Sequence, residues 1–278
     1  MPVLLISRGS YSGGQILAEC LFQKGLRCLT REDLIDRVND YREIATRTVA
    51  SIAQASQNYA QFSAMRKPFK ILMRLALLEY VRQGDVAYFG YSGHLLLHPV
   101  PAHIVRVRII VPMQTRITRL MMRKNMSVEN AREQIHQEDE QRSRWARFMY
   151  GKNLCDPGDF DICVNLDRLS PCGACSLLLR AGEHADFRPT AESIAMVENS
   201  YLSTKVLAAL ISDSRTAELE IGAAARDGHI DLQGPYLEPQ ELSAVMDIAN
   251  SVAGVQEVRY TEGYSPDFEL QIAHEEAS

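Results

Sequence analysis

The first 180 residues alternate short apolar runs with longer segments of helical periodicity, and this alternation limits the folds open to the chain. The runs typical of buried strands are residues 3–7, 86–90, 103–111 and 161–166. The segments typical of helices are residues 13–24, 31–65, 69–83, 114–124, 127–150 and a stretch from about residue 170. Strands that alternate with helices predict a parallel sheet covered by helices on both faces. We therefore expect an α/β fold whose ligand lies at the carboxyl ends of the strands.

Residues 4–21, LLISRGSYSGGQILAECL, read as a strand, a glycine-rich turn and a helix. A helix N-terminus offers unpaired N–H groups to a phosphate, and glycine lets the backbone approach it. Gly9 and Gly14 have the spacing that opens the P-loop pattern, but Gln15 stands where that pattern has lysine. The residues expected to hold a nucleotide phosphate are Arg8, Gly9, Ser10, Ser12, Gly13, Gly14 and Gln15. The spacing alone is equally compatible with a tight turn that binds nothing.

Charge is distributed unevenly along the chain. Residues 1–181 carry 25 Lys and Arg against 17 Asp and Glu, a net of +8, whereas residues 199–278 carry 4 against 14, a net of −10. The basic part suits an anionic ligand such as a nucleotide, and the acidic part argues against nucleic acid polymers and anionic lipid. No apolar run approaches the roughly 20 residues that span a bilayer, and the first residues lack a basic leader. We therefore expect a cytoplasmic protein without a membrane span.

Six cysteines are present, and Cys172 and Cys175 alone form a C-x-x-C spacing. We favour free thiols near a helix start, with a redox pair or half a zinc site as the alternative. No second Cys/His pair with zinc-ligand spacing accompanies them in the sequence, so we expect no metal site. His94, His98 and His103 lack ligand-spaced partners and read as structural or surface residues.

A different pattern follows a stretch, residues 182–198, that reads as a linker. A helix at residues 201–213 precedes two strands, a second helix at 238–255 and a last strand from residue 256. The turn between the two strands falls at Arg226-Asp227-Gly228, where glycine supplies the positive φ of a tight hairpin. This α-β-β-α-β order predicts a small α+β domain at residues 199–271, with an acidic tail at 272–278.

Residues 1–181 resemble the cytidylate kinase-like family. Ile6-Ser7-Arg8, Ser12-Gly13-Gly14 and Ile16 match its opening pattern ISR-x-x-GSGG-x-x-IA. Residues 30–38 and 84–97 are similar to its next two segments, and residues 106–170 match its order and spacing, with a D-x-x-R motif at Asp139 and Arg142. Members of this family also lack the P-loop lysine, so its absence here is a family trait.

The resemblance implies a P-loop kinase fold and transfer of the γ-phosphoryl group of ATP, with Mg²⁺, to a nucleoside monophosphate such as CMP. Asp139 and Arg142 match family positions, and helical geometry adds Arg144 and Arg147 as catalytic candidates because guanidinium groups bind phosphate oxygens bidentately. The residues implied on the monophosphate side are Arg31, Gly90, Tyr91 and Gly93. Arg142 and Arg144 also read as partners of Glu138 and Glu140 at i, i+4 on a solvated helix.

Two tyrosines depart from the family pattern. Tyr11 stands where the family has glycine, and Tyr91 stands where it has an arginine. A catalytically weak or inactive nucleotide sensor or scaffold is therefore the alternative to an active kinase.

The C-terminal domain resembles a BON domain. The residues that carry this resemblance are Gly228, Ile230, Leu232, Gly234 and Gly254-Val255. The resemblance implies binding of a ligand or a protein without chemistry, and regulation of the nucleotide-binding part through this domain.

Overall fold

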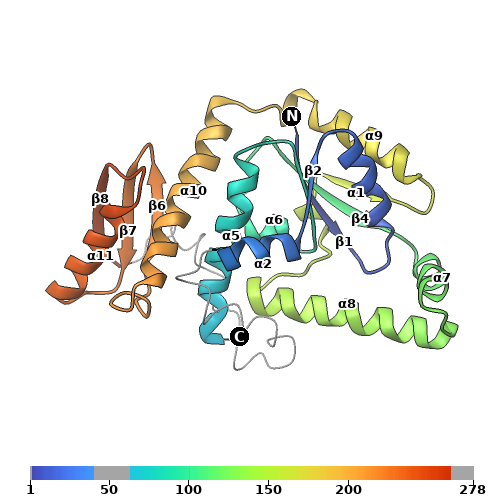
Figure 1. Ribbon diagram of the computed structural model, residues 1–278, viewed down its shortest axis with the longest axis horizontal. Coiled ribbons are helices and arrows are strands. Elements are labelled where there is room, and N and C mark those ends of the chain that lie inside the picture. The colour runs from blue at the N-terminus through green and yellow to red at the C-terminus, as the bar shows by residue number, and fades with distance from the viewer. Residues whose placement is uncertain (1, 41–62, 100, 264–278) are drawn as a thin grey trace. The chain divides into compact units, whose positions relative to one another are not determined.

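The computed structural model describes residues 2–40, 63–99 and 101–263. The chain divides into two compact units (Figure 1). The first comprises residues 1–31 and 83–190, and the second comprises residues 32–82 and 191–278. The second unit is therefore built from two separate stretches of the chain. The expected acidic tail, and residues 41–62 of the expected helix at 31–65, lie outside the described residues.

The first unit contains a five-stranded parallel sheet in the order β2-β3-β1-β4-β5. The strands are β1 (Val3–Arg8), β2 (Arg27–Thr30), β3 (Val86–Gly90), β4 (Ile104–Ile110) and β5 (Ile162–Asn165). The helices are α1 (Gly14–Gln23), α6 (Gly93–Leu96), α7 (Met113–Lys124), α8 (Val128–Tyr150) and α9 (Pro171–Gly182), with short 3-10 turns at Pro157–Asp159 and Ala185–Phe187. The expected α/β fold with a parallel sheet is confirmed. Strand β2 and the one-turn helix α6 were not expected.

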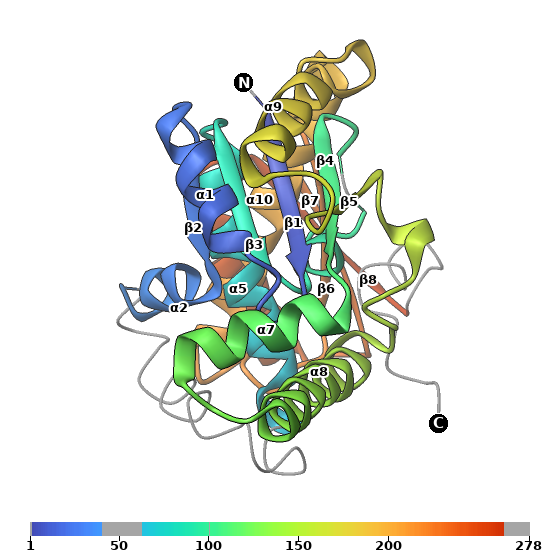
Figure 2. The ribbon, with the colours of Figure 1, turned by 90° about the vertical axis from the view of Figure 1, so that its right-hand side faces the viewer.

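The central strand β1 is buried along most of its length, because its apolar run packs on both faces of the sheet. Leu4 and Ile6 join the apolar residues of α1 and α9 in one core cluster. Figure 2 shows α1 and α9 side by side along the sheet, in agreement with their packing contacts. In register, Ser7 of β1 lies between Gly90 of β3 and Arg108 of β4. The carboxyl ends of three neighbouring strands thus meet at one edge.

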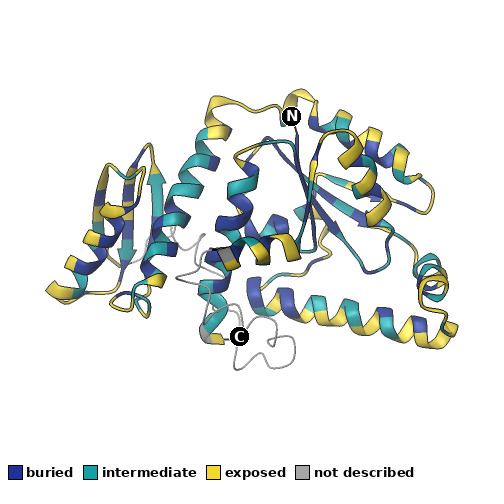
Figure 3. Ribbon diagram, in the orientation of Figure 1, coloured by how far each residue is buried: buried dark blue, intermediate teal, exposed yellow. Residues whose placement is uncertain are grey.

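Helices α7 and α8 pack against each other through a separate small cluster around Ile117, Leu120 and Ile135. Helix α8 is capped at its start by Ser127, whose Oγ accepts a hydrogen bond from the Asn130 N–H at 3.2 Å. Much of α8 faces solvent, since exposed residues recur along it (Figure 3).

The second unit contains a three-stranded sheet and helices that pack on the sheet and on one another. Strand β7 pairs antiparallel with β6 and parallel with β8. Its elements are most of α2 (Arg31–Asp40), a 3-10 turn (Ser63–Met65), α5 (Arg66–Val81), α10 (Ala191–Ser212), β6 (Gly222–Arg226), β7 (His229–Gly234), α11 (Pro239–Ser251) and β8 (Glu257–Glu262). From α10 onward the expected α-β-β-α-β order is confirmed. Helix α10 begins at Ala191, inside the stretch expected to be a linker, and it packs against α5 and β6.

The hairpin between β6 and β7 turns as expected. Asp227 and Gly228 both have positive φ, +50° and +87°, which matches the tight turn of a two-residue hairpin loop. Residues 185–212, which include α10, form the one helical stretch of the described chain whose length and mean hydropathy, 1.2, would suffice to cross a membrane. A core helix can have the same properties, and α10 packs against α5 and β6.

Candidate phosphate-binding site

The loop between β1 and α1 leads the chain from the carboxyl end of the central strand into a helix N-terminus. Gly13 precedes the helix with a φ of +81°, and no side chain among the described residues caps the first turn of α1. Ser10 and Ser12 are 2% and 1% exposed, so the loop is folded tightly onto the sheet. Uncapped N–H groups at a helix start are suited to bind an anion.

Arginine side chains approach the glycines of this loop closely. A Cβ atom at Gly13 would lie 2.8 Å from Arg119 Nη1, and one at Gly14 would lie 2.6 Å from Arg8 Cδ. A Cβ at Gly9 would lie 3.5 Å from Arg116 Cζ. The glycines therefore leave room for guanidinium groups against the backbone.

Two buried polar atoms at this loop are suited to bind an anionic ligand. Within the described residues, Ser12 Oγ and Arg119 Nη1 are buried without a hydrogen-bond partner. Buried donors are normally satisfied. A nucleotide phosphate supplies acceptor oxygens for a hydroxyl, a guanidinium group and free backbone N–H groups together, so the residues present fit such a group.

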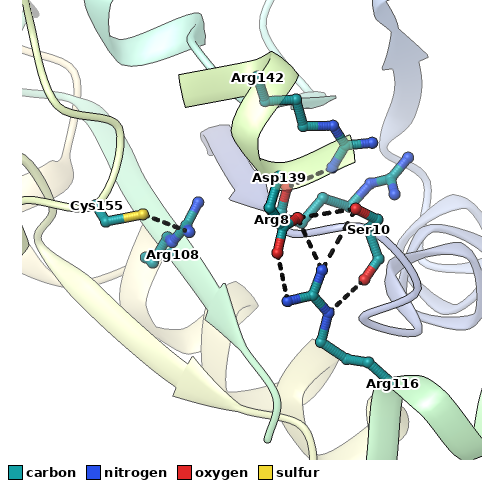
Figure 4. A network of polar contacts seen from close by, with 7 residues as sticks. All are labelled: Arg8, Ser10, Arg108, Arg116, Asp139, Arg142 and Cys155. Carbon is teal, nitrogen blue, oxygen red and sulfur yellow. Dashed lines mark hydrogen bonds and ion pairs between the residues drawn. The ribbon is translucent and has the colours of Figure 1, made fainter. Parts of the chain in front are cut away.

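Asp139 of α8 and Arg116 of α7 form the centre of a polar network at the loop (Figure 4). Arg116 Nη1 lies 2.7 Å from Asp139 Oδ2, and Arg116 Nη2 donates to Asp139 Oδ1 at 2.8 Å. Arg116 Nε also donates to the Ser10 carbonyl at 2.7 Å, and Ser10 Oγ donates to Asp139 Oδ1 at 2.9 Å. Burial raises the pKa of Asp139, but the hydrogen bonds and charge of Arg116 outweigh burial and hold this pKa below its usual value. The Asp139 carboxylate thus accepts hydrogen bonds from Arg116 that a phosphate oxygen could also accept.

Tyr11 extends the loop toward α8. Its hydroxyl donates to Glu138 Oε1 at 2.7 Å and accepts a hydrogen bond from Gln134 Nε2 at 2.8 Å. Its φ is +56°, in the left-handed region that favours glycine. Burial, and then the hydrogen bond to Glu138, raise the pKa of Tyr11 to about 12.

The expected catalytic arginines differ in position. Arg142 Nη1 donates to the Arg8 carbonyl at 3.5 Å, and its guanidinium lies 5.6 Å from the centre of the Tyr91 ring. Arg144 and Arg147 lie on the exposed side of α8, and neither has a hydrogen bond to the loop within the part of the chain that the structure describes. The structure brings Asp139 and Arg142 to the loop and leaves Arg144 and Arg147 at the surface of α8. Gln15, expected in the phosphate site, is also exposed.

The expected monophosphate side lies at the carboxyl end of β3. Tyr91 is half-buried, and its carbonyl accepts a hydrogen bond from Ser7 Oγ at 3.2 Å. Gly90 and Gly93 pack on the buried ring of Tyr88, since a Cβ at either would lie within 3 Å of that ring. A side chain at either position would clash with this ring, so packing alone explains why both residues are glycine. The Arg31 guanidinium lies 5.8 Å from the centre of the Trp145 ring.

Arg108 was not expected at this site and lies beside it. Arg108 Nη1 donates to Ser7 Oγ at 2.8 Å, and its Nη2 donates to Cys155 Sγ at 3.2 Å. His94 lies nearby, 4% exposed, with its ring centre 4.5 Å from that of Phe160. Burial, and then the charge of Arg108, lower the pKa of His94 to about 4, so this histidine is neutral at pH 7. Its burial against Phe160 agrees with the structural role expected from the sequence.

The sequence patterns did not indicate Arg116 and Arg119, which approach the glycines of the loop, or Arg108. Arg116 and Arg119 are spaced i, i+3 on α7, so they face the same side of that helix. This spacing is visible in the sequence, but two arginines at i, i+3 also occur on solvated helices that bind no ligand. Among the described residues, no group of three or more His, Cys, Asp and Glu is placed to hold a metal ion.

A glycine-rich turn after a central parallel strand, surrounded by arginines from three elements, defines a nucleotide-binding protein of the kinase-like type. The comparison with protein families agrees with this class. Residues 3–168 match the cytidylate kinase-like family. Because the match covers more than half of the chain, the chain belongs to that family.

Other similarities are more distant. A uronate isomerase from Corynebacterium glutamicum is 27% identical over 162 residues, which cover 56% of this chain and 31% of that protein. The chain thus spans about a third of the length of this curated relative.

Similar solved structures include a protein from Eubacterium ventriosum, with a TM-score of 0.47, 16% identity and coverage of 66% of this chain and 98% of that chain. A shikimate kinase from Bacteroides thetaiotaomicron has a TM-score of 0.38 at 13% identity, covering 66% of this chain and 99% of that chain.

Proposed function

We propose that this chain binds ATP at the loop of residues 9–14 and transfers the γ-phosphoryl group to a nucleoside monophosphate such as CMP. The observation that carries the proposal is the group of arginines, Arg8, Arg116 and Arg119, held against the glycines of an uncapped helix N-terminus. Phosphoryl transfer needs little covalent chemistry from a protein. It needs groups that position the phosphates and neutralise the charge that develops on them.

In this proposal, different residues bind the phosphates of ATP and the acceptor monophosphate. On the ATP side, Arg119 Nη1 and Ser12 Oγ are buried donors that phosphate oxygens would satisfy. On the acceptor side, Arg108 and Tyr91 lie at the ends of the strands next to β1. Arg142 lies between them, with contacts to both Arg8 and Tyr91. Mg²⁺ would enter with the ATP phosphates, since this ion commonly binds proteins through one or two carboxylates and the substrate phosphates.

The second candidate function is a nucleotide sensor with little or no turnover. The observation that favours it is the Asp139–Arg116 ion pair, because the carboxylate occupies a guanidinium group that catalysis would need for phosphate. The bonds of Tyr11 to Gln134 and Glu138 hold the loop to α8 in the same arrangement. In this reading the α-β-β-α-β part is a BON-type domain that binds a ligand or a protein and regulates nucleotide binding. For both candidate functions, we expect the protein to be cytoplasmic.

Two measurements on one set of variants separate these functions. ATP binding is measured by calorimetry with Mg²⁺, and turnover by a coupled ADP-release assay with each nucleoside monophosphate in turn. The variants are Arg119→Ala and Arg142→Ala, with Arg132→Ala as the matched control, because Arg132 is an exposed arginine of α8. We expect Arg119→Ala to weaken ATP binding at least about tenfold, since it removes a charge-assisted hydrogen bond to phosphate.

Turnover that Arg142→Ala abolishes and Arg132→Ala preserves supports the kinase. ATP binding without turnover for any monophosphate supports the sensor. If neither ATP nor any of the monophosphates binds or raises the melting temperature of the wild type, both functions are wrong, because a ligand specific to the folded state must stabilise it.

A further inference from the structure

The cysteine pair that the sequence singles out is not the pair that the structure brings together. Cys175 of α9 is 2% exposed and belongs to the core cluster of the sheet. Cys172, one turn earlier, is exposed, and its Sγ lies 3.3 Å from the Sγ of Cys20 on α1. These two thiols are 152 residues apart in the sequence, so the contact depends on the packing of α1 against α9.

The geometry points to a redox-active dithiol at Cys20 and Cys172, which a peroxide or a small-molecule disulfide closes to an intramolecular disulfide between α1 and α9. The sulfur atoms need to approach from 3.3 Å to about 2.05 Å, a movement within reach of side-chain rotation because α1 and α9 already pack together. Cys172 is exposed and Cys20 is half-buried, so a small oxidant reaches the pair. This inference does not depend on the proposed function.

The order of events follows from the two environments. Cys172 lies in the first turn of α9 and is the more exposed of the two thiols. The hydrogen bond with Cys172 raises the pKa of the half-buried Cys20 thiol, so Cys20 forms a thiolate less readily. We therefore assign the first attack to Cys172 and the resolving step to Cys20.

With hydrogen peroxide the step balances as follows. The Cys172 sulfur attacks one peroxide oxygen, the O–O bond breaks, and a sulfenic acid and one water form. Cys20 then attacks the sulfenic sulfur, the S–S bond forms, the S–O bond breaks, and a second water leaves. The two thiols lose two electrons and two protons in all, and the peroxide is reduced to two molecules of water. With glutathione disulfide, Cys172 attacks one sulfur and displaces one glutathione, and Cys20 then attacks the mixed disulfide and displaces the second glutathione.

The experiment uses the full chain, reduced and then treated with hydrogen peroxide or glutathione disulfide. Remaining thiols are blocked with N-ethylmaleimide, and the linked peptides are identified by mass spectrometry. We expect a peptide pair that contains Cys20 and Cys172, a fall from six free thiols to four, and reversal by dithiothreitol. A monomer with this link gains thermal stability, because the disulfide closes a long loop of the unfolded chain. We expect a rise in melting temperature of about 5 °C.

Three single variants make the assignment specific. Cys20→Ser and Cys172→Ser each abolish the linked peptide and the thermal shift, whereas the exposed Cys163→Ser leaves both unchanged. A peptide link between Cys172 and Cys175 that persists in Cys20→Ser overturns the inference. So does a wild type that keeps six free thiols, or one whose only oxidised product is a dimer on a non-reducing gel.

Discussion

The Tyr11 hydroxyl donates a hydrogen bond to Glu138 Oε1 at 2.7 Å, and this bond joins the loop between β1 and α1 to the long helix α8. Gln134, one turn earlier on α8, donates to the same hydroxyl at 2.8 Å. A glycine at this position could make neither contact. Tyr11 therefore supplies a connection between the loop and the helix that carries Asp139 and Arg142.

Removing the Tyr11 hydroxyl is expected to loosen α8. Tyr11→Phe keeps the ring but loses both hydrogen bonds, so the free energy of unfolding falls by about 1 kcal/mol. Amide hydrogen exchange in residues 134–142 becomes faster than in the wild type. The control is Tyr236→Phe, since Tyr236 is 66% exposed. Unchanged exchange in residues 134–142 of Tyr11→Phe would show that this contact does not hold the helix.

Asp139 contributes stability that depends on pH. Its pKa in the folded chain is lower than in the unfolded chain, so the contribution is fully present above a pH of about 4 and is lost as pH falls through the folded pKa. We expect Asp139→Asn to be about 2 kcal/mol less stable than the wild type at pH 7, because hydrogen bonds to charged groups are lost. Urea unfolding at pH 7 and at pH 3 measures the difference. A difference that is the same at both pH values contradicts the role of the ionised carboxylate.

Gly13 is expected to be required for its positive φ and for the close approach of Arg119. A matched variant at Gly25 separates these two reasons. Gly13 and Gly25 both have positive φ, +81° and +94°, but a Cβ at Gly25 meets nothing within 4 Å. Each alanine variant is expected to lose about 1 kcal/mol of stability through backbone strain. Gly13→Ala also displaces Arg119, so its affinity for ATP falls at least about tenfold while that of Gly25→Ala is unchanged. Equal ATP affinity in the two variants would exclude the close approach of Arg119 as a binding requirement.

His94 is expected to make the folded chain sensitive to mild acid. Its pKa is about 4 in the folded chain and near 6.5 in the unfolded chain, so the unfolded chain takes up the proton first as pH falls. The wild type should lose up to about 3 kcal/mol of stability between pH 7 and pH 4 through this group. His94→Leu should lack this part of the pH dependence, whereas the exposed His136→Asn should retain it. Chemical denaturation at several pH values tests the difference, and parallel curves for the wild type and His94→Leu would refute it.

The strands and helices that the sequence predicts well are those with long apolar runs or clear periodicity. Strand β2 was missed because its four residues begin with the exposed Arg27 and hold no continuous apolar run. The start of α10 was missed because the polar residues after Pro189 read as a linker, although the helix begins at Ala191. Neither element is defined by its own sequence pattern. Both are stabilised by neighbours, β3 for β2 and α5 for α10.

The candidate site was predicted only in part, for the same physical reason. The glycines of the loop and the D-x-x-R motif were visible as local patterns. The positions of Arg116 and Arg119 depend on how α7 approaches the loop, and no pattern within α7 reports that approach. Likewise, the C-x-x-C spacing drew attention to Cys175, but burial in the core removes Cys175 from the surface and leaves Cys172 beside Cys20.

The division of the second unit into residues 32–82 and 191–278 has a consequence for how the protein is made. A ribosome releases helix α5 long before it releases α10, against which α5 packs. During that interval the face of α5 that packs against α10 has no partner. The first unit, in contrast, is complete once residue 190 has emerged. The nascent chain therefore carries an unfinished second unit until the stretch that begins at residue 191 has been made.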